Sequence, residues 1–464
     1  MLFGSLSRIG DSLIRFASPK NPQKSPLLRS ENFVTKVFFG GRGIKRSKSF
    51  RIYEYFNEAI AENTCSKIWF GFKCFGIRVY NMLITNAKIL TMAGQSFNNG
   101  FIRIENGRIV EVDQMRDGLL DDEIIDAGSA LVMPGFIDAH THLGMFEDSL
   151  GFEGDDGNED SDPATPQLRA LDAINPMDKC FDEALRAGVT TVVTGPGSAN
   201  AIGGQMLAMK TYGNCVDAML VKEPVAMKMA LGENPKSVYH GKGESPRTRM
   251  ATASIIRTQL IKAQRYLKDL ERSQTDEDFD APEYDEKCEA LIPLFKDKLP
   301  VHFHAHRADD IFTAMRIAQE FDLNYLIVHA TQGHKIANEL KDKNVGVLCG
   351  PILCDRSKPE LQELTPESVG LLDKAGVECA IITDHPVIPI QYLPLCAALA
   401  VREGLDYNRA LEAITINAAK LCGIDNRVGS IEVGKDADIV IFETDPLAVY
   451  SKPKAVIIGG QRVY

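Results

Sequence analysis

The chain has 464 residues, of which 44% are apolar and 25% are charged, with 52 Lys and Arg against 63 Asp and Glu. This composition is typical of a soluble globular protein, and the absence of any run of about 18 apolar residues disfavours a membrane-spanning helix, so we expect no membrane partner. The formal net charge of −11 disfavours binding to nucleic acid.

Residues 1–80 are set apart by their charge, with 14 Lys and Arg against five Asp and Glu. A basic, acid-poor segment interrupted by prolines is typical of an organelle transit peptide. It is equally what translation from an upstream in-frame start would add ahead of a protein that begins at Met82, and a genuine extra domain is the third interpretation. We expect this extension to be disordered.

The ten cysteines are scattered and form no C-x-x-C pair. This usage is typical of reduced thiols, and it predicts a cytoplasmic protein, or a protein of an organelle matrix if the first 80 residues are a transit segment.

Short strands joined by glycine turns are predicted at both ends of the remaining chain. Near its start, Asn106-Gly107 is a two-residue hairpin signal between FIRIE and RIVEV. Near its end, ADIVIFETD and AVIIGGQRVY show the same pattern, with a turn at Gly459-Gly460. We predict that residues 82–134 and 425–464 together form one small β-sandwich domain.

The middle of the chain, residues 135–424, repeats a helix-to-strand pattern. One helix is expected from Asn175-Pro176 to Gly188 and another from Thr365-Pro366 to Gly376, and the apolar strands VTTVVT and VECAIIT follow them. Continuous apolar strands are typical of parallel sheets that are covered on both faces. We predict an α/β fold with a TIM-like (β/α)8 barrel, and an open doubly wound sheet is the alternative.

Two acid-rich stretches interrupt this pattern. Residues 147–160 hold seven acids and three glycines and follow a histidine pair, so they are interpreted either as a solvated loop or as an active-site lid. Residues 275–286 are interpreted as a solvated loop.

Metal-competent side chains follow several predicted strands. His140 and His142 are two residues apart, so in a strand they face the same side about 6.6 Å apart and can reach one ion. His302, His304 and His306 share one side of another strand, but the outer two are about 13 Å apart along it, so at most two of the three lie near any ion. His329 and Asp384 end two further apolar runs. Such a coincidence of strand ends predicts a metal site.

This order of histidines and a final Asp, between two β segments, resembles the metal-dependent amidohydrolase superfamily. The phrases MPGFIDAHTH and GSIEVGKDADIVIF are similar to signatures of its imidazolonepropionase-related branch, and the resemblance covers residues 82–464. It implies two Zn²⁺ per chain, one held by His140, His142 and Asp384 and a second held by His304 and His329. It further implies a bridging ligand, for which carbamylated Lys228 is the first candidate, Glu223 the rival and Lys222 the third.

The expected function is hydrolysis of a carbon–nitrogen bond in a small amide, cyclic amide or dipeptide-like molecule by a metal-bound hydroxide. Asp384, as the proton shuttle, and His329 are the expected catalytic residues. Arg307, His306, His334 and His385 are predicted to contact the substrate, although Arg307 is equally explained as a partner for nearby acids. The alternatives are a one-metal deaminase on the same barrel and a non-catalytic scaffold. We expect a homo-oligomer.

Overall fold

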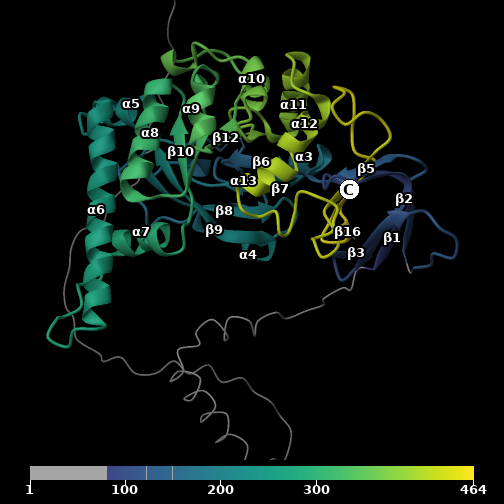
Figure 1. Ribbon diagram of the computed structural model, residues 1–464, viewed down its shortest axis with the longest axis horizontal. Coiled ribbons are helices and arrows are strands. Elements are labelled where there is room, and N and C mark those ends of the chain that lie inside the picture. Colours follow the sequence, from purple (N-terminus) through teal and green to yellow (C-terminus); the bar gives the residue numbers. More distant parts are fainter. Residues whose placement is uncertain (1–80, 122, 149) are drawn as a thin grey trace, which may run out of the picture. The chain divides into compact units, whose positions relative to one another are not determined.

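The computed structural model describes residues 81–464, apart from residues 122 and 149 (Figure 1). The basic extension of residues 1–80, which we expected to be disordered, lies outside the described residues. Among the described helices, none combines the length and the apolar character that crossing a membrane requires.

The first and last strands of the described chain form a sheet of eight strands. Its order is β16–β15–β14–β5–β1–β2–β3, and β4 pairs with β1. Because β5 and β14 pair antiparallel, segments more than 300 residues apart in sequence build the sheet together. The strands pair in one sheet, so the sandwich arrangement stays a prediction. The bounds are β1 Met82–Leu90, β2 Ser96–Glu105, β3 Arg108–Gln114, β4 Ile124–Asp126, β5 Leu131–Pro134, β14 Ile439–Phe442, β15 Ala455–Ile458 and β16 Gln461–Arg462.

The predicted hairpin turn at Asn106-Gly107 is confirmed between β2 and β3. Both residues have positive φ, 52° and 76°, as the tight two-residue turns of antiparallel hairpins require. A Cβ atom at Gly107 would lie 2.5 Å from the carbonyl oxygen of Gly459, in the turn between β15 and β16. The two hairpin turns therefore approach each other so closely that only glycine fits.

The second sheet also has eight strands and forms a nearly closed barrel of order β13–β12–β11–β10–β9–β8–β7–β6. Its edges approach each other at the ends of β6 and β13, where the amide of Asp384 donates to the carbonyl of His140 and the amide of His142 donates to that of His385. The bounds are β6 Phe136–Thr141, β7 Val189–Thr194, β8 Ile202–Lys210, β9 Leu220–Ala230, β10 Val301–Ala305, β11 Tyr325–His329, β12 Gly346–Cys349 and β13 Cys379–Ile381.

One strand departs from the predicted parallel barrel. Strand β8 runs antiparallel to both of its neighbours, β7 and β9, whereas the pairs formed by the other strands of this sheet are parallel. The seven residues 195–201 that join β7 to β8 are too few for the crossover that a parallel neighbour requires. The barrel is therefore TIM-like without eight regular strand–helix repeats.

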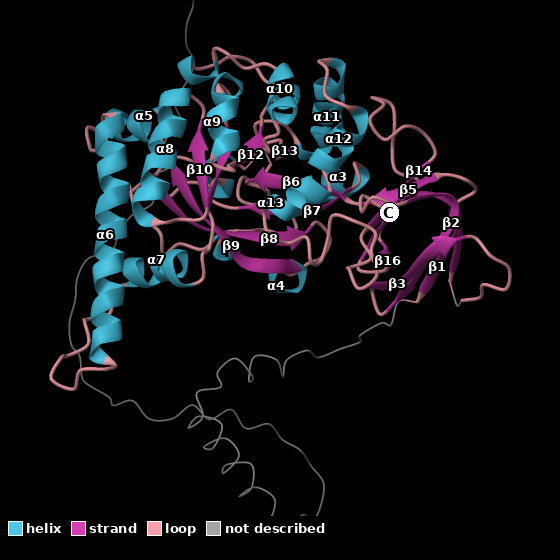
Figure 2. Cartoon of the chain, in the orientation of Figure 1, coloured by secondary structure: helices cyan, strands magenta, loops and turns pink. Residues whose placement is uncertain are grey.

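Helices cover the outside of the barrel (Figure 2). The expected helix before VTTVVT begins at Lys179 rather than at Pro176. The one before VECAIIT spans Glu367–Ala375, and Gly376 caps it in left-handed conformation. The bounds are α3 Lys179–Arg186, α4 Val216–Met219, α5 Glu233–Lys242, α6 Arg249–Ser273, α7 Glu286–Lys296, α8 Ala308–Phe321, α9 Ala337–Asp342, α10 Glu367–Ala375, α11 Leu393–Arg402, α12 Tyr407–Ala413 and α13 Ile416–Leu421.

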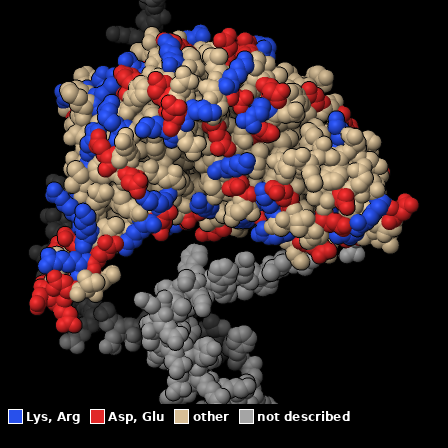
Figure 3. All heavy atoms as spheres, viewed as in Figure 1, with Lys and Arg blue, Asp and Glu red and all other residues tan. Residues whose placement is uncertain are grey.

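Charged side chains of both signs are interspersed over the face of the molecule in Figure 3. Acidic side chains gather at its lower left, over the loop that follows α6. That loop contains the acid-rich residues 275–286, of which Asp278 and Glu283 are exposed. Acidic side chains of this loop are thus exposed to solvent, as expected for the solvated loop predicted at residues 275–286.

Candidate metal centre

The first group of metal-competent side chains lies where the two edges of the barrel approach each other. His140 and His142 are buried at the end of β6, and their Nε2 atoms lie 3.5 Å and 3.3 Å from Oδ1 of Asp384. The Nδ1 atom of His142 is 2.7 Å from the carbonyl oxygen of Gly195, which orients the ring. The strand spacing thus directs both imidazoles toward one carboxylate.

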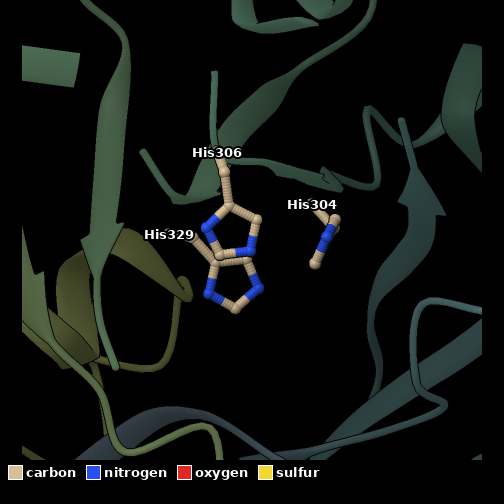
Figure 4. A group of neighbouring side chains, drawn as sticks. All are labelled: His304, His306 and His329. Atoms are coloured by element: carbon tan, nitrogen blue, oxygen red, sulfur yellow. The ribbon is translucent and has the colours of Figure 1, made fainter. Parts of the chain in front are cut away.

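The second group lies at the ends of β10 and β11. His304, His306 and His329 are buried, and each offers a nitrogen within 4.8 Å of those of the other two (Figure 4). Each ring is held by a hydrogen bond at Nδ1. That of His304 pairs with Ser198 Oγ at 2.9 Å, that of His306 pairs with Thr331 Oγ1 at 2.7 Å, and that of His329 donates to the carbonyl oxygen of Gly350 at 2.7 Å. These hydrogen bonds leave the Nε2 atom of each ring available as a ligand.

Backbone strain places two of these side chains. His329 and Asp384 have φ values of +79° and +56°, and Ala330, next to His329, has +47°. Non-glycine residues rarely adopt this left-handed region, and such strain is concentrated at functional sites. In the register of β10 and β11, Val328 rather than His329 lies opposite His304. The left-handed backbone at His329 therefore brings its ring toward that of His304, and the two ring centroids are 4.4 Å apart.

Lys228 reaches the first group from β9. Its side chain is fully buried, and its Nζ lies 2.8 Å from Nε2 of His140. Burial lowers the pKa of the Lys228 ammonium to about 7, although the negative charge of Asp384 opposes this shift. At neutral pH a large share of this lysine is therefore an uncharged amine.

The other two candidates for a bridging ligand lie elsewhere. The carboxylate of Glu223 is bound by the guanidinium of Arg169, at 2.9 Å from Nε. The ammonium of Lys222 donates to the carbonyl of Gly423 at 3.3 Å. Of the three candidates, Lys228 is the one whose side-chain nitrogen is placed against a predicted ligand.

Burial keeps four histidines of the centre neutral. It lowers the pKa values of His140, His304 and His306 well below the ordinary value and that of His329 to about 4. For Asp384, burial alone would raise the pKa, but His329, His142 and Lys228 hold it below its ordinary value, so this carboxylate is ionised. Neutral imidazoles and an ionised carboxylate are the protonation states that a metal requires.

The residues present fit a divalent cation. Nε2 of His304 and of His329 are buried and have no hydrogen-bond partner among the described residues. Buried polar atoms without a partner are rare, and they cost free energy unless something binds them. Convergent imidazole nitrogens and carboxylate oxygens are the ligands that Zn²⁺ takes in proteins.

The predicted substrate contacts are dispersed. His306 contributes a nitrogen to the second metal-competent group. Arg307 forms a two-point ion pair with Asp309, with both contacts at 2.9 Å, so its guanidinium already has a partner. His334 lies in the 3₁₀ helix Gly333–Ile336, where the nearby charges are Glu363, Lys335 and Glu367. His385 is buried beside the first group, and its Nδ1 accepts from the amide of Ile390 at 3.2 Å.

Two further acids belong to the surroundings of the centre, and neither was predicted from the sequence. Glu360 is 1% exposed, and its Oε1 lies 3.7 Å and 3.6 Å from Nε2 of His304 and His306. Asp138 is buried beneath His140 and accepts from Oγ1 of Thr383 at 2.5 Å, across the edges of the barrel. Burial raises the pKa of Asp138 to about 7. Glu360 follows the end of β12, and position at a strand's carboxyl end is the signal that could have found it.

His302 is also fully buried on β10, opposite Lys228 in the strand register. Burial lowers its pKa to about 3, so the ring is neutral. Neither ring nitrogen has a hydrogen-bond partner among the described residues, and the metal-competent groups do not include it.

Comparisons with known proteins agree on one family. The model of the "Amidohydrolase family" matches residues 131–463. A crystal structure of an amidohydrolase from Thermotoga maritima MSB8 is 41% identical, covers 82% of this chain and 99% of that chain, and superposes with a TM-score of 0.79.

Two curated relatives extend this result. The amidohydrolase tasK of Hapsidospora irregularis is 31% identical over 392 residues, 78% of this chain but only 39% of that protein, so the chain spans well under half of its length. An imidazolonepropionase of Solibacter usitatus is 26% identical over 79% of this chain and 91% of the relative.

Proposed function

The chain belongs to the amidohydrolase family of metal-dependent hydrolases that act on carbon–nitrogen bonds, and we propose that its substrate is a small amide, cyclic amide or dipeptide-like molecule. The observation that carries this proposal is the convergence of His140 and His142 on Asp384, with Lys228 against His140. The relation to an imidazolonepropionase supports a small cyclic or linear amide, but family membership alone does not fix the substrate.

We place two Zn²⁺ in this centre. His140, His142 and Asp384 would hold the first ion, and His304 and His329 would hold the second, with carbamylated Lys228 between them. When bound, such cations acidify a water molecule and polarise the scissile carbonyl.

The chain's own residues supply the proton transfers and the dry environment. Asp384 is ionised, because neighbouring histidines and Lys228 hold its pKa below the ordinary value, so its carboxylate can accept a proton from water. The proton then passes from Asp384 to the leaving nitrogen, which departs as a neutral amine. Burial of His140, His304 and His329 keeps bulk water from competing at this point. Arg307, His334 and His385 remain our candidates for contacts with the rest of the substrate.

A one-metal deaminase is the second candidate function. The nitrogens of His140 and His329 and a carboxylate oxygen of Asp384 all lie within 4.8 Å of one another, so a single ion can also find three ligands here. This arrangement needs neither Lys228 nor the remaining histidines of the second group.

Metal analysis and substrate screening separate these functions. The purified protein, expressed with ample zinc, is expected to contain about two metal equivalents per chain; one equivalent would favour the deaminase, and none would contradict both. The metal-loaded protein should then be screened against N-acyl amino acids, dipeptides and cyclic ureas, with release of an amine as the readout. Release of ammonia from aminopurines, with no hydrolysis of amides, would instead support the deaminase.

A further inference from the structure

We propose that a cavity at the amino ends of the barrel strands binds a small organic anion, a molecule with an apolar body and a carboxylate or phosphate group. The cavity has a volume of about 560 Å³, which is within the range of small-molecule sites. The proposal does not depend on the proposed function, because none of the metal-competent residues lines this cavity.

The lining residues place the cavity at the face of the barrel opposite the metal centre. Tyr325 and Gly346 are the first residues of β11 and β12. Pro300 and Glu378 directly precede β10 and β13. A strand rises about 3.3 Å per residue, so His329, at the other end of β11, lies about 13 Å from Tyr325 along the strand. A small molecule that fills the cavity is therefore separate from the substrate.

Part of the cavity wall is apolar and belongs to the core of the barrel. Leu326, Val345 and Val377 line the cavity and are each 3% exposed. The other aliphatic side chains and prolines of the wall are Pro224, Pro293, Leu299, Pro300 and Leu421. Transfer of an apolar group from water onto such a wall is favourable, so the cavity suits a ligand with an apolar body.

The charged residues of the wall are mainly basic. Lysines from four separate segments line the cavity, namely Lys222 in β9, Lys298 before β10, Lys341 in α9 and Lys420 in α13. The acids of the wall are Asp297 and Glu378, so cations outnumber anions by four to two. The whole chain has a net charge of −11. The cavity therefore has a local charge opposite to that of the chain, and this charge attracts an anion.

Two of the four lysines are free to bind a ligand. Lys298 pairs with Asp322, and Lys222 donates to a backbone carbonyl. Lys341 and Lys420 form neither an ion pair nor a side-chain hydrogen bond with any residue in the described part of the chain. Each lies in the last turn of its helix, where unpaired backbone carbonyls attract a cation. That attraction explains where the two lysines lie, but it leaves their ammonium groups available to an anion.

A glycine allows the ammonium of Lys341 to lie against the cavity wall. Gly376, which also lines the cavity, caps α10 with a φ of +82°. A Cβ atom at this position would collide with Nζ of Lys341. The ammonium thus occupies space that a larger residue would fill. Lysine ammonium groups bind phosphate and carboxylate oxygens as point charges, so this position is suited to the headgroup of the ligand.

The experiment measures the binding of matched probes to the zinc-loaded full chain by isothermal titration calorimetry. Phenylacetate and phenyl phosphate each join an aromatic ring to an anionic group, 2-phenylethanol is the neutral counterpart, and 2-phenylethylamine is the cationic one. We expect at least one anion to bind at least about tenfold more tightly than the neutral and cationic probes, and its affinity to fall as salt is added. The tighter of the two anions identifies the headgroup as carboxylate or phosphate.

Substitutions in the wall separate this cavity from the metal centre, because bound Zn²⁺ also attracts anions. The double variant Lys341→Gln, Lys420→Gln should bind the anion at least about tenfold more weakly than the wild type. Lys374→Gln is the matched control, because it removes an exposed lysine from the last turn of α10 that does not line the cavity, and it should bind as the wild type does. Asn324→Trp should weaken binding without a change of charge, because it places a large ring at an exposed position of the wall.

Three results would overturn the proposal. They are equal affinity for the anions in the wild type and the double variant, no binding of either anion to the wild type, and binding of 2-phenylethylamine as tightly as the anions. Circular dichroism should show that the variants are folded. Metal content and turnover are measured separately, so failure of this proposal would leave the proposed function intact.

Discussion

The Nζ atom of Lys228 lies 2.8 Å from Nε2 of His140, and both side chains are fully buried. Burial penalises the charged form of this lysine, so it favours the uncharged amine beside the imidazole. The pKa of about 7 supports this reading, because burial outweighs the attraction of Asp384 for the ammonium.

Carbamylation of Lys228 is therefore expected in the presence of zinc and bicarbonate. Protein incubated with ¹³C-labelled bicarbonate should show a carbamate signal in ¹³C NMR, and the signal should grow between pH 6 and pH 8 because the free amine is the reacting form. Lys228→Met should lose the signal and most of the turnover. Lys222→Met is the control, because the ammonium of Lys222 contacts the carbonyl of Gly423 instead, and this variant should keep the carbamate signal and the turnover. Turnover that survives in Lys228→Met would exclude a bridging role for Lys228.

Asp384→Asn tests the proton shuttle. The amide keeps the shape of the side chain but cannot accept a proton, so kcat at saturating Zn²⁺ should fall by at least about 100-fold. Asp269→Asn, on the exposed side of α6, is the control for a lost charge and should be as active as the wild type. Circular dichroism should show both variants folded, and full activity of Asp384→Asn would exclude this mechanism.

Ser198→Ala tests the outer hydrogen bond to His304. Without the hydroxyl at 2.9 Å, the ring loses the contact that orients Nε2. Zinc affinity of the second site should fall by about 10-fold to 100-fold, measured by competition with a chelator. Ser161→Ala, at an exposed position, should bind zinc as the wild type does, and an unchanged affinity in Ser198→Ala would show that the ring is held by packing alone.

Asp436 joins the terminal sheet to the barrel through Lys210, at 3.0 Å, and Arg427, at 2.7 Å. Burial opposes ionisation, but the two cations hold the pKa of Asp436 below its ordinary value. The pairing therefore stabilises the fold at neutral pH. Its contribution is lost as the pH falls from the ordinary pKa of an aspartate, which applies in the unfolded chain, toward the lower pKa of Asp436 in the folded protein. Asp436→Asn should cost about 3 kcal/mol at pH 7, because Asp438 still contacts Lys210.

Urea unfolding of the metal-free protein checks this prediction. The difference in unfolding free energy between wild type and Asp436→Asn should be clearly smaller at pH 3 than at pH 7. An equal difference at both values would mean that the side chain stabilises by packing or hydrogen bonding rather than by charge. Asp269→Asn again serves as the control, with no expected change at either pH.

The parts of the centre that follow from strand periodicity could be predicted from the sequence. Side chains two apart on a strand share a face, which is why His140 and His142 converge on one carboxylate. The same rule places His304 and His306 together. Strand periodicity does not predict the contact of His329 with His304, because the left-handed backbone of His329 is what brings the two rings together.

Glu360 and strand β8 show where the sequence is less informative. The run Lys358-Pro359-Glu360 has the proline and the acid that commonly begin a short helix, and it forms one, so the residue types alone indicate a helix start and only the position after β12 points to the centre. The apolar residues of β8 indicate a buried strand but not its direction. The short connection from β7 makes β8 run antiparallel to it. The length of this connection can be read from the sequence only once the ends of both strands are known.

The pairing of β5 with β14 also has a consequence for how the protein is made. During synthesis, β5 emerges from the ribosome more than 300 residues before β14. Until the last part of the chain arrives, the backbone groups on that side of β5 lack their native partner, an open edge that invites association with other chains. The nascent polypeptide must therefore either shield this edge or complete its barrel first, and we expect chains truncated before residue 439 to aggregate rather than to accumulate as a folded barrel.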